Sequence, residues 1–180
     1  MLLIVGLGNP EKEYEFTYHN AGALVLRRLR EEFKADFGPV EKSKYFNFSK
    51  GVDPETGDNL VFLWPATYMN ESGIAVRAAL KFFKVKPADL IVFHDDSDLP
   101  MGAVKISESP NAAGHHGLMS IQKELGVDNF RRLKIGVRDP KEKKRRKAEE
   151  FVLKTIPKTK LERLYPEDLI STWRFLRKKS

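Results

Sequence analysis

Residues 2–20, LLIVGLGNPEKEYEFTYHN, contain the strongest indication of the fold. Their first part, Leu2–Leu7, is an apolar run typical of a buried strand, and a Gly-x-Gly-Asn-Pro motif (residues 6–10) ends it. A Thr-x-His-Asn motif (residues 17–20) then opens an amphipathic helical pattern. Because open α/β sheets place reactive side chains at the carboxyl ends of their strands, this layout predicts that Asn9 and His19 form half of an active site.

Two later segments predict the other half. Residues 60–65 (LVFLWP) form an apolar strand that leads through residues 66–73 (ATYMNESG) into a helical pattern, which places Asn70 at a strand-to-helix junction. Residues 90–93 (LIVF) form another buried strand, and residues 94–100 (HDDSDLP) follow it directly. We therefore expect Asn70 and a carboxylate of this second segment to lie beside His19.

The remaining apolar pattern predicts alternating helices and strands. Strands are expected over residues 2–7, 45–48, 59–64, 89–93, 103–107 and 133–137, and helices near residues 23–33, 75–83, 118–125 and 167–178. Helices between buried strands, together with hairpin-like strand pairs, indicate an α/β fold. We predict a single domain over residues 1–180, with a mixed, twisted β-sheet flanked by helices on both faces.

Composition agrees with an intracellular enzyme. The chain has 180 residues and no cysteine, which excludes disulfides and thiolate chemistry and fits the cytoplasm. No apolar run approaches the roughly 20 residues of a membrane span, and the N-terminal apolar stretch is too short for a signal peptide. We expect a soluble, unprocessed, cytoplasmic protein without a membrane partner.

Basic residues are concentrated in the C-terminal half. The formal net charge is +7, and the run KEKKRRK, residues 141–147, follows several basic positions between residues 131 and 138. Such clustering is typical of a protein that meets a phosphate backbone. A solvated face or a mobile loop is the plain alternative for a charge run.

The polar residues at the strand ends suggest hydrolysis. His19 can accept a proton near neutral pH, and Asp95 is its natural partner. A helix N-terminus would lower the pKa of His19 and Asp95 would raise it, so the sequence leaves the sign of the shift open. The amides of Asn9 and Asn70 suit holding a water and a carbonyl. Without a Gly-x-Ser-x-Gly elbow or a cysteine, a water activated by His19 is the simplest nucleophile.

Each of these residues also has a structural interpretation. His19 could begin a helix, Asn9 before a proline suits a turn, and Asn70 could cap the following helix. Asp96 and Asp98 are more typical of turn or surface residues, and His94 and His115 of structural positions or, at best, substrate contacts. The Gly6-x-Gly8 pair lacks the third glycine of a dinucleotide loop, because Glu11 stands there.

Five sequence blocks, taken in order, resemble one family. They are residues 5–10 with positions 14, 17, 19, 20 and 22, then residues 67–73, 94–102, 114–118 and 132–137. Together these blocks resemble bacterial-type peptidyl-tRNA hydrolase over roughly residues 2–153. The resemblance implies hydrolysis of the ester that joins a peptide to the 3′ ribose of tRNA, which releases peptide and free tRNA for recycling.

The resemblance also implies a role for individual residues. His19 would activate water, Asp95 would orient His19, and Asn9 and Asn70 would position the carbonyl and main chain of the peptide. The further residues expected to bind the peptide are Tyr14, Tyr68, Met69 and His116, and those expected to meet the acceptor-stem phosphates are Lys105, Arg132 and Lys134. No cofactor and no metal are expected, and we expect a monomer.

The chain departs from the family pattern in three informative places. Tyr18 stands where the family usually has Arg, and Glu11 where it has Gly. His116 stands where the family has a substrate-contacting Asn, and a neutral imidazole could replace that amide because it also offers one donor and one acceptor. Alternatively, Asn111 could approach the substrate. The tail after Leu153 is only loosely matched.

Two other classes of function stay open. The first is a non-catalytic RNA-binding relative of the same fold, against which the intact pair of His19 and Asp95 argues. The second is a metal-dependent phosphoester hydrolase that uses the histidine and carboxylates of residues 94–98, since carboxylates at strand ends are common Mg²⁺ ligands. Measured turnover separates the first from a hydrolase, and chelator sensitivity separates the second.

Overall fold

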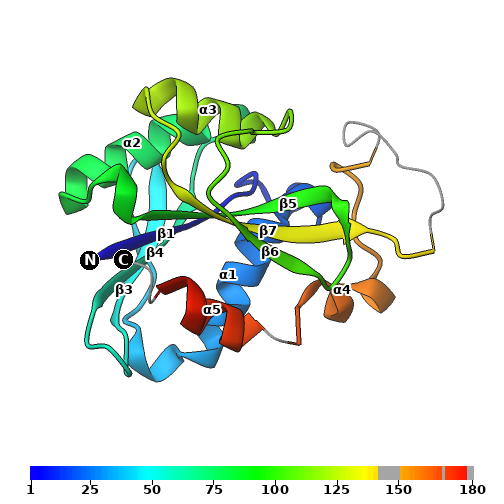
Figure 1. The fold of residues 1–180 in the computed structure, drawn as a ribbon, viewed down its shortest axis with the longest axis horizontal. Coiled ribbons are helices and arrows are strands. Elements are labelled where there is room, and N and C mark those ends of the chain that lie inside the picture. Colours follow the sequence, from blue (N-terminus) through cyan, green and yellow to red (C-terminus); the bar gives the residue numbers. More distant parts are fainter. Residues whose placement is uncertain (142–150, 168, 178–180) are drawn as a thin grey trace.

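The computed structural model describes residues 1–141, 151–167 and 169–177. In these ranges the chain forms one seven-stranded sheet in the order β2-β3-β4-β1-β5-β7-β6 (Figure 1). The strands are β1 (Leu2–Gly6), β2 (Glu41–Lys42), β3 (Phe46–Val52), β4 (Asn59–Pro65), β5 (Leu90–Pro100), β6 (Val104–Ser107) and β7 (Arg131–Arg138). The α-helices are α1 (Ala21–Glu32), α2 (Ser72–Phe83), α3 (His116–Leu125), α4 (Lys158–Leu164) and α5 (Leu169–Arg177).

The sheet is mixed. Its centre is parallel, because β1 pairs in parallel with β4 and β5, and β5 pairs in parallel with β7. Its two edges are antiparallel, with β2 and β3 on one side and β6 on the other. Helices α2 and α3 cover one face, and α1, α4 and α5 cover the other (Figure 1). The predicted α/β fold with a mixed sheet between two helical layers is confirmed.

Two apolar cores hold these layers together. Successive side chains of a strand point to opposite faces, so Leu3 and Val5 of β1 pack with α2 and α3, whereas Leu2 and Ile4 pack with α1 and the C-terminal helices. Each fully buried aliphatic side chain of this kind contributes roughly 1.5–3 kcal/mol. None of the helices in the described ranges is long and apolar enough to cross a membrane.

Strand β5 is longer than the sequence predicts. Its apolar run ends at Phe93, but pairing with β7 continues through Asp96, which lies opposite Gly136, and resumes at Pro100 after an irregularity. Asp95 is therefore held on a strand in the sheet.

Helix α4 was not among the predicted elements, because Leu164 is its one fully buried residue and gives no apolar period. Most of the basic run, residues 142–147, lies outside the described residues.

Candidate active site

A cavity of about 390 Å³ opens at the carboxyl ends of β1, β4 and β5. All four residues predicted to be catalytic line it: Asn9, His19, Asn70 and Asp95. Asn9 and His19 come from the connection between β1 and α1, Asn70 from the connection between β4 and α2, and Asp95 from β5 itself, which is consistent with an open α/β fold. The structure therefore brings together residues that lie up to 86 positions apart in the chain, from 9 to 95.

His19 reaches the cavity from a 3₁₀ turn, η2 (Tyr18–Asn20), that leads directly into α1. The start of α1 lies against β1 and β5, where the Ala23 N–H donates to the Leu7 carbonyl at 2.9 Å. Gly22 permits this approach, because a Cβ at that position would lie 2.2 Å from the Phe93 carbonyl oxygen. The His19 backbone N–H donates to the Val152 carbonyl at 2.8 Å, so the C-terminal segment also fixes the turn.

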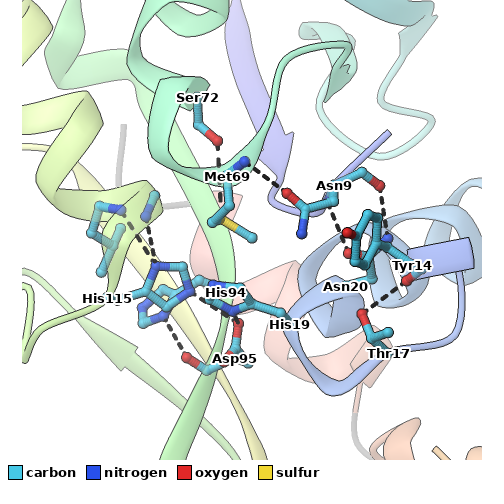
Figure 2. Close-up of polar contacts among 12 residues, drawn as sticks. Asn9, Tyr14, Thr17, His19, Asn20, Met69, Ser72, His94, Asp95 and His115 are labelled. Carbon is cyan, nitrogen blue, oxygen red and sulfur yellow. Dashed lines mark hydrogen bonds and ion pairs between the residues drawn. The ribbon is translucent and has the colours of Figure 1, made fainter. Parts of the chain in front are cut away.

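The imidazole of His19 is oriented by Asp95. Nδ1 of His19 lies 2.8 Å from Oδ1 of Asp95, and both residues are buried (Figure 2). Because the carboxylate accepts, the proton sits on Nδ1 and Nε2 keeps a lone pair toward the cavity. Burial by itself would lower the pKa of His19, but the charge of Asp95 and its hydrogen bond raise it above the ordinary 6.5. The sequence left the direction of the His19 pKa shift open, and in the structure the shift is upward.

A second histidine donates to the same carboxylate oxygen. His115 caps α3, and its Nδ1 accepts from the N–H groups of Gly117 and Leu118 at 3.2 and 3.4 Å. The ring proton must therefore sit on Nε2, which donates to Oδ1 of Asp95 at 3.0 Å. Burial would raise the pKa of Asp95, but His19 and His115 hold it well below its usual range. Asp95 remains a carboxylate between two N–H donors.

His94 supports the same strand from inside. Its Nδ1 donates to the backbone carbonyl of Asp95 at 2.8 Å, and its ring is buried. Burial and the neighbouring His115 lower the pKa of His94 to about 3. His94 is therefore neutral near pH 7. It holds the backbone carbonyl of Asp95 and leaves the carboxylate to His19 and His115.

Asn9 is held by a backbone clamp. The side chain of Asn20 accepts from the Asn9 N–H at 2.8 Å and donates to the Asn9 carbonyl at 3.0 Å (Figure 2). The Asn9 side chain in turn accepts from the Met69 N–H at 2.8 Å, which identifies the accepting atom as Oδ1. Its Nδ2 amide group is left as a hydrogen-bond donor at the cavity. Asn20 was not among the predicted site residues, because nothing in its spacing reveals that it holds Asn9.

The connection after β4 supplies Met69 and Asn70, in the 3₁₀ turn η4 (Met69–Glu71). Met69 is buried and lines the cavity, and its sulfur lies 4.0 Å from Oγ of Ser72. Asn70 is exposed at the rim, and its amide makes no hydrogen bond within the described ranges. It does not cap α2, whose N-cap position is Glu71. Asn70 is thus available to a ligand.

Both the sequence and the fold of this chain match known proteins. The family model for peptidyl-tRNA hydrolase matches residues 3–174. The chain belongs to the peptidyl-tRNA hydrolase family. A peptidyl-tRNA hydrolase from Brevibacillus brevis is 39% identical over 157 residues, which cover 87% of this chain and 80% of that protein. One from Pseudomonas fluorescens is 45% identical over 139 residues, which cover 77% and 70%. The crystal structure of peptidyl-tRNA hydrolase from Acinetobacter baumannii matches with a TM-score of 0.77 and 31% identity, over 91% of this chain and 81% of that one.

In this member of the peptidyl-tRNA hydrolase family, the residues expected to bind the peptide are only partly gathered. Tyr68 and His116 line the cavity and are exposed. The Tyr68 hydroxyl donates to the carboxylate of Glu11, the residue that replaces the family's glycine. Tyr14 lies outside the cavity, in the turn η1 (Lys12–Tyr14), where its carbonyl accepts from the backbone and hydroxyl of Thr17.

The three predicted RNA contacts have different surroundings. Lys134 lines the cavity, and its Nζ lies 3.0 Å from Oδ2 of Asp96. Lys105 is exposed on β6 directly opposite Lys134, so the two side chains share one face of the sheet. Arg132 differs from the expectation, because its side chain is fully buried and its guanidinium donates to backbone carbonyls. A buried guanidinium offers no surface to a phosphate.

The geometry also bears on metal binding. Among the described residues, His19, Asp95 and His115 are the group whose ligand atoms lie close enough together to hold an ion. Nε2 of His115 carries a proton there, so a metal would have to break the hydrogen bonds that fix this tautomer. Both oxygens of Asp96 are already in use, by Lys134 and by two backbone N–H groups. In this site the two histidines bind the Asp95 carboxylate through hydrogen bonds.

Proposed function

We propose that this chain hydrolyses the ester bond of peptidyl-tRNA with a water molecule that His19 activates. The observation that carries the proposal is the orientation of His19. Asp95 accepts from Nδ1 at 2.8 Å, which leaves the Nε2 lone pair at a cavity that Asn9 and Asn70 also line. A neutral imidazole with a fixed tautomer is the usual general base for attack by water.

In the proposed reaction His19 takes up one proton and later releases it. Nε2 of His19 takes a proton from water as the water oxygen forms a bond to the ester carbonyl carbon. The negative charge that develops on the carbonyl oxygen is met by the Nδ2 amide of Asn9, which faces the cavity because Oδ1 accepts from Met69. The bond to the 3′ ribose oxygen then breaks, and the proton on His19 passes to that oxygen. Peptide and tRNA leave.

The rim of the cavity would hold the peptide. The amide of Asn70, which has no hydrogen-bond partner in the described part of the chain, can bind the peptide main chain, and Met69 offers a buried apolar wall beside it. Tyr68 and His116 stand at the edge of the same cavity and are the further peptide contacts in this proposal. Tyr14 does not line the cavity, so its predicted role gains no support from its position.

The tRNA would approach along the β6–β7 edge of the sheet. Lys105 and Lys134 share one face there, and Lys134 reaches the cavity where the 3′ end must enter. We propose that these cations meet phosphates of the acceptor stem, with support from the formal net charge of +7. We further propose that the protein is a cytoplasmic monomer and a single domain, as the sequence predicts, since its substrate arises during translation.

The decisive experiment is deacylation of an N-acyl-aminoacyl-tRNA and of the matching free aminoacyl-tRNA, each with and without chelator. We expect release from the N-acylated substrate alone, unchanged by chelator. Loss of activity with chelator would favour a metal-dependent hydrolase. Binding of tRNA without turnover would favour a non-catalytic RNA-binding relative. The RNA path is tested by the salt dependence of tRNA affinity, whose slope should diminish in Lys105→Ala and Lys134→Ala.

A further inference from the structure

Arg132 is one of the largest fully buried side chains in the protein, with a relative exposure of 0%. A buried charge is costly unless it is paired, and no carboxylate pairs with Arg132 among the described residues. Its guanidinium instead donates to three backbone carbonyls and lies over the ring of Phe130, 4.7 Å from the ring centre. Such an arrangement suits a residue that holds main chain in place.

The carbonyls that Arg132 binds belong to the two loops on either side of α3. Nη1 donates to Asn111 at 2.9 Å, and Nη2 donates to Pro110 at 3.3 Å and more weakly to Asp128 at 3.5 Å. Pro110 and Asn111 lie in the loop before α3, and Asp128 lies in the loop after it. One planar guanidinium on β7 thus fixes both ends of the α3 unit to the sheet.

The loop before α3, residues 108–115, forms one wall of the cavity. Residues 111–115 all line it, and at the loop's end His115 donates to Asp95. The loop is not relaxed: Ala113 has a φ of 49°, in the left-handed region that costs a residue with a Cβ on the order of 1–2 kcal/mol. A strained loop keeps its shape only when surrounding contacts determine it. Among these contacts are the bonds from Arg132, whose side chain is fully buried.

We propose that Arg132 is a positioning residue that sets the wall formed by residues 108–115, and through it His115, for the reaction at His19. This inference rests on the proposed hydrolysis for its kinetic consequence, and on the contacts above for its structural part. The proposal gives Arg132 a different role from Lys105 on β6 and Lys134 on β7. Lys105 is exposed, and Lys134 lines the cavity. Arg132 acts through the loop; the lysines would act on RNA.

The test uses Arg132→Lys in the full-length protein, with Arg131→Lys as the matched control. Arg131 is the neighbour on β7, is also buried, and donates to the Leu176 carbonyl at 2.5 Å on the opposite face of the sheet. Lysine keeps the charge and loses the planar fork in both variants. We expect Arg132→Lys to lower kcat/KM by about tenfold or more, because small misplacements of a site are costly. Arg131→Lys should stay within about twofold.

A double-mutant cycle with His115→Ala shows whether the loss passes through the loop. If it does, Arg132→Lys should cost less than about twofold when His115 is already absent. If Arg132→Lys lowered kcat/KM by the same factor in the wild-type and His115→Ala backgrounds, the proposal would be overturned. Equal losses are what a general destabilisation of the protein would produce. The salt slope of tRNA affinity should be the same for Arg132→Gln and wild type. A slope reduced by about one, with kcat unchanged, would make Arg132 a phosphate ligand and refute the proposal.

Two measurements do not depend on turnover. Amide hydrogen exchange should rise at residues 110–116 in Arg132→Lys and stay unchanged there in Arg131→Lys; equal exchange in the two variants would contradict the proposal. In wild type, phenylglyoxal should modify the exposed Arg77, whose side chain is 62% exposed, and spare Arg132 with or without tRNA. Modification of Arg132 that tRNA prevents would refute the proposal even if the variants did not fold. An inactive wild type with the expected exchange would reject the hydrolysis and keep the loop assignment.

Discussion

The cavity has two walls that are built in different ways. Within the first wall, residues 9–20, Asn20 clamps the backbone of Asn9 across 11 positions, and the turn with His19 runs directly into α1; Met69 and Val152 also bind this wall from outside. The second wall, residues 108–115, is held by Arg132, at least 17 positions later in the chain, and by His115, which donates to Asp95 across 20 positions. The wall with the proposed catalytic histidine thus contains its own clamp, whereas the other wall takes its shape from an arginine that lies outside it on β7.

In the proposed reaction the first wall carries the chemistry, so the largest effect should come from His19. We expect His19→Ala to lower kcat by at least about a hundredfold, the usual scale for a lost general base, with tRNA affinity nearly unchanged. Single-turnover deacylation and tRNA titration measure the two quantities. Near wild-type turnover would remove His19 from the mechanism and with it the distinction between the walls.

Asp95 joins the walls, because it accepts from His19 and from His115 on one oxygen. Asp95→Asn should cost less in kcat than His19→Ala, since the amide oxygen can still accept from both rings. The pH profile should also move. Burial alone lowers the pKa of His19 and Asp95 raises it, so kcat/KM of wild type should fall with pH below a midpoint above 6.5, and that midpoint should drop in Asp95→Asn. A loss larger than for His19→Ala would favour the metal-dependent alternative.

Breaking the clamp of the first wall should have an intermediate effect. Asn20→Ala leaves the N–H and carbonyl of the half-buried Asn9 without these partners, so we expect a loss of about 1 kcal/mol in the free energy of unfolding. Turnover should fall by about tenfold, because the Asn9 amide is no longer held at the carbonyl oxygen. The control is Asn20→Ala in an Asn9→Ala background. There the substitution should lower kcat little further; an undiminished loss would show that Asn20 acts elsewhere.

The smallest effect is expected at His116, at the end of the second wall. Its side chain is exposed at the cavity and makes no hydrogen bond within the described ranges. His116→Asn introduces the amide that the family resemblance implies at this position and should change KM by less than about threefold, with kcat unchanged. His116→Ala should raise KM more than His116→Asn does. Equal KM values for the two variants would exclude a substrate contact, and a selective loss in Asn111→Ala would assign that contact to Asn111.

Much of the fold follows from the sequence. Apolar runs and turn residues predict the central strands and the helices α1, α2 and α3, because burial on one or both faces leaves a period in the residues themselves. The extension of β5 beyond Phe93 does not follow, because polar residues 94–98 continue a strand only when β7 is beside them. Helix α4 escapes for a related reason, since Leu164 is its one fully buried residue.

The chemical groups of the candidate site can be predicted from the residues alone, because His19, Asp95, Asn9 and Asn70 follow predicted strands, and the carboxyl ends of parallel strands share one edge of a sheet. How those groups are oriented and charged depends on the folded structure. The raised pKa of His19 and the outward amide of Asn9 depend on Asp95 and Met69, which lie far away in the chain. The tautomer of His115 depends on backbone N–H groups that only the folded first turn of α3 presents to its ring. Arg132 shows the same limit most clearly. A basic residue beside other basic residues suggests RNA, and only packing shows that its guanidinium is buried among carbonyls. Residue type fixes what a side chain can do, and its surroundings in three dimensions fix which of those things it does.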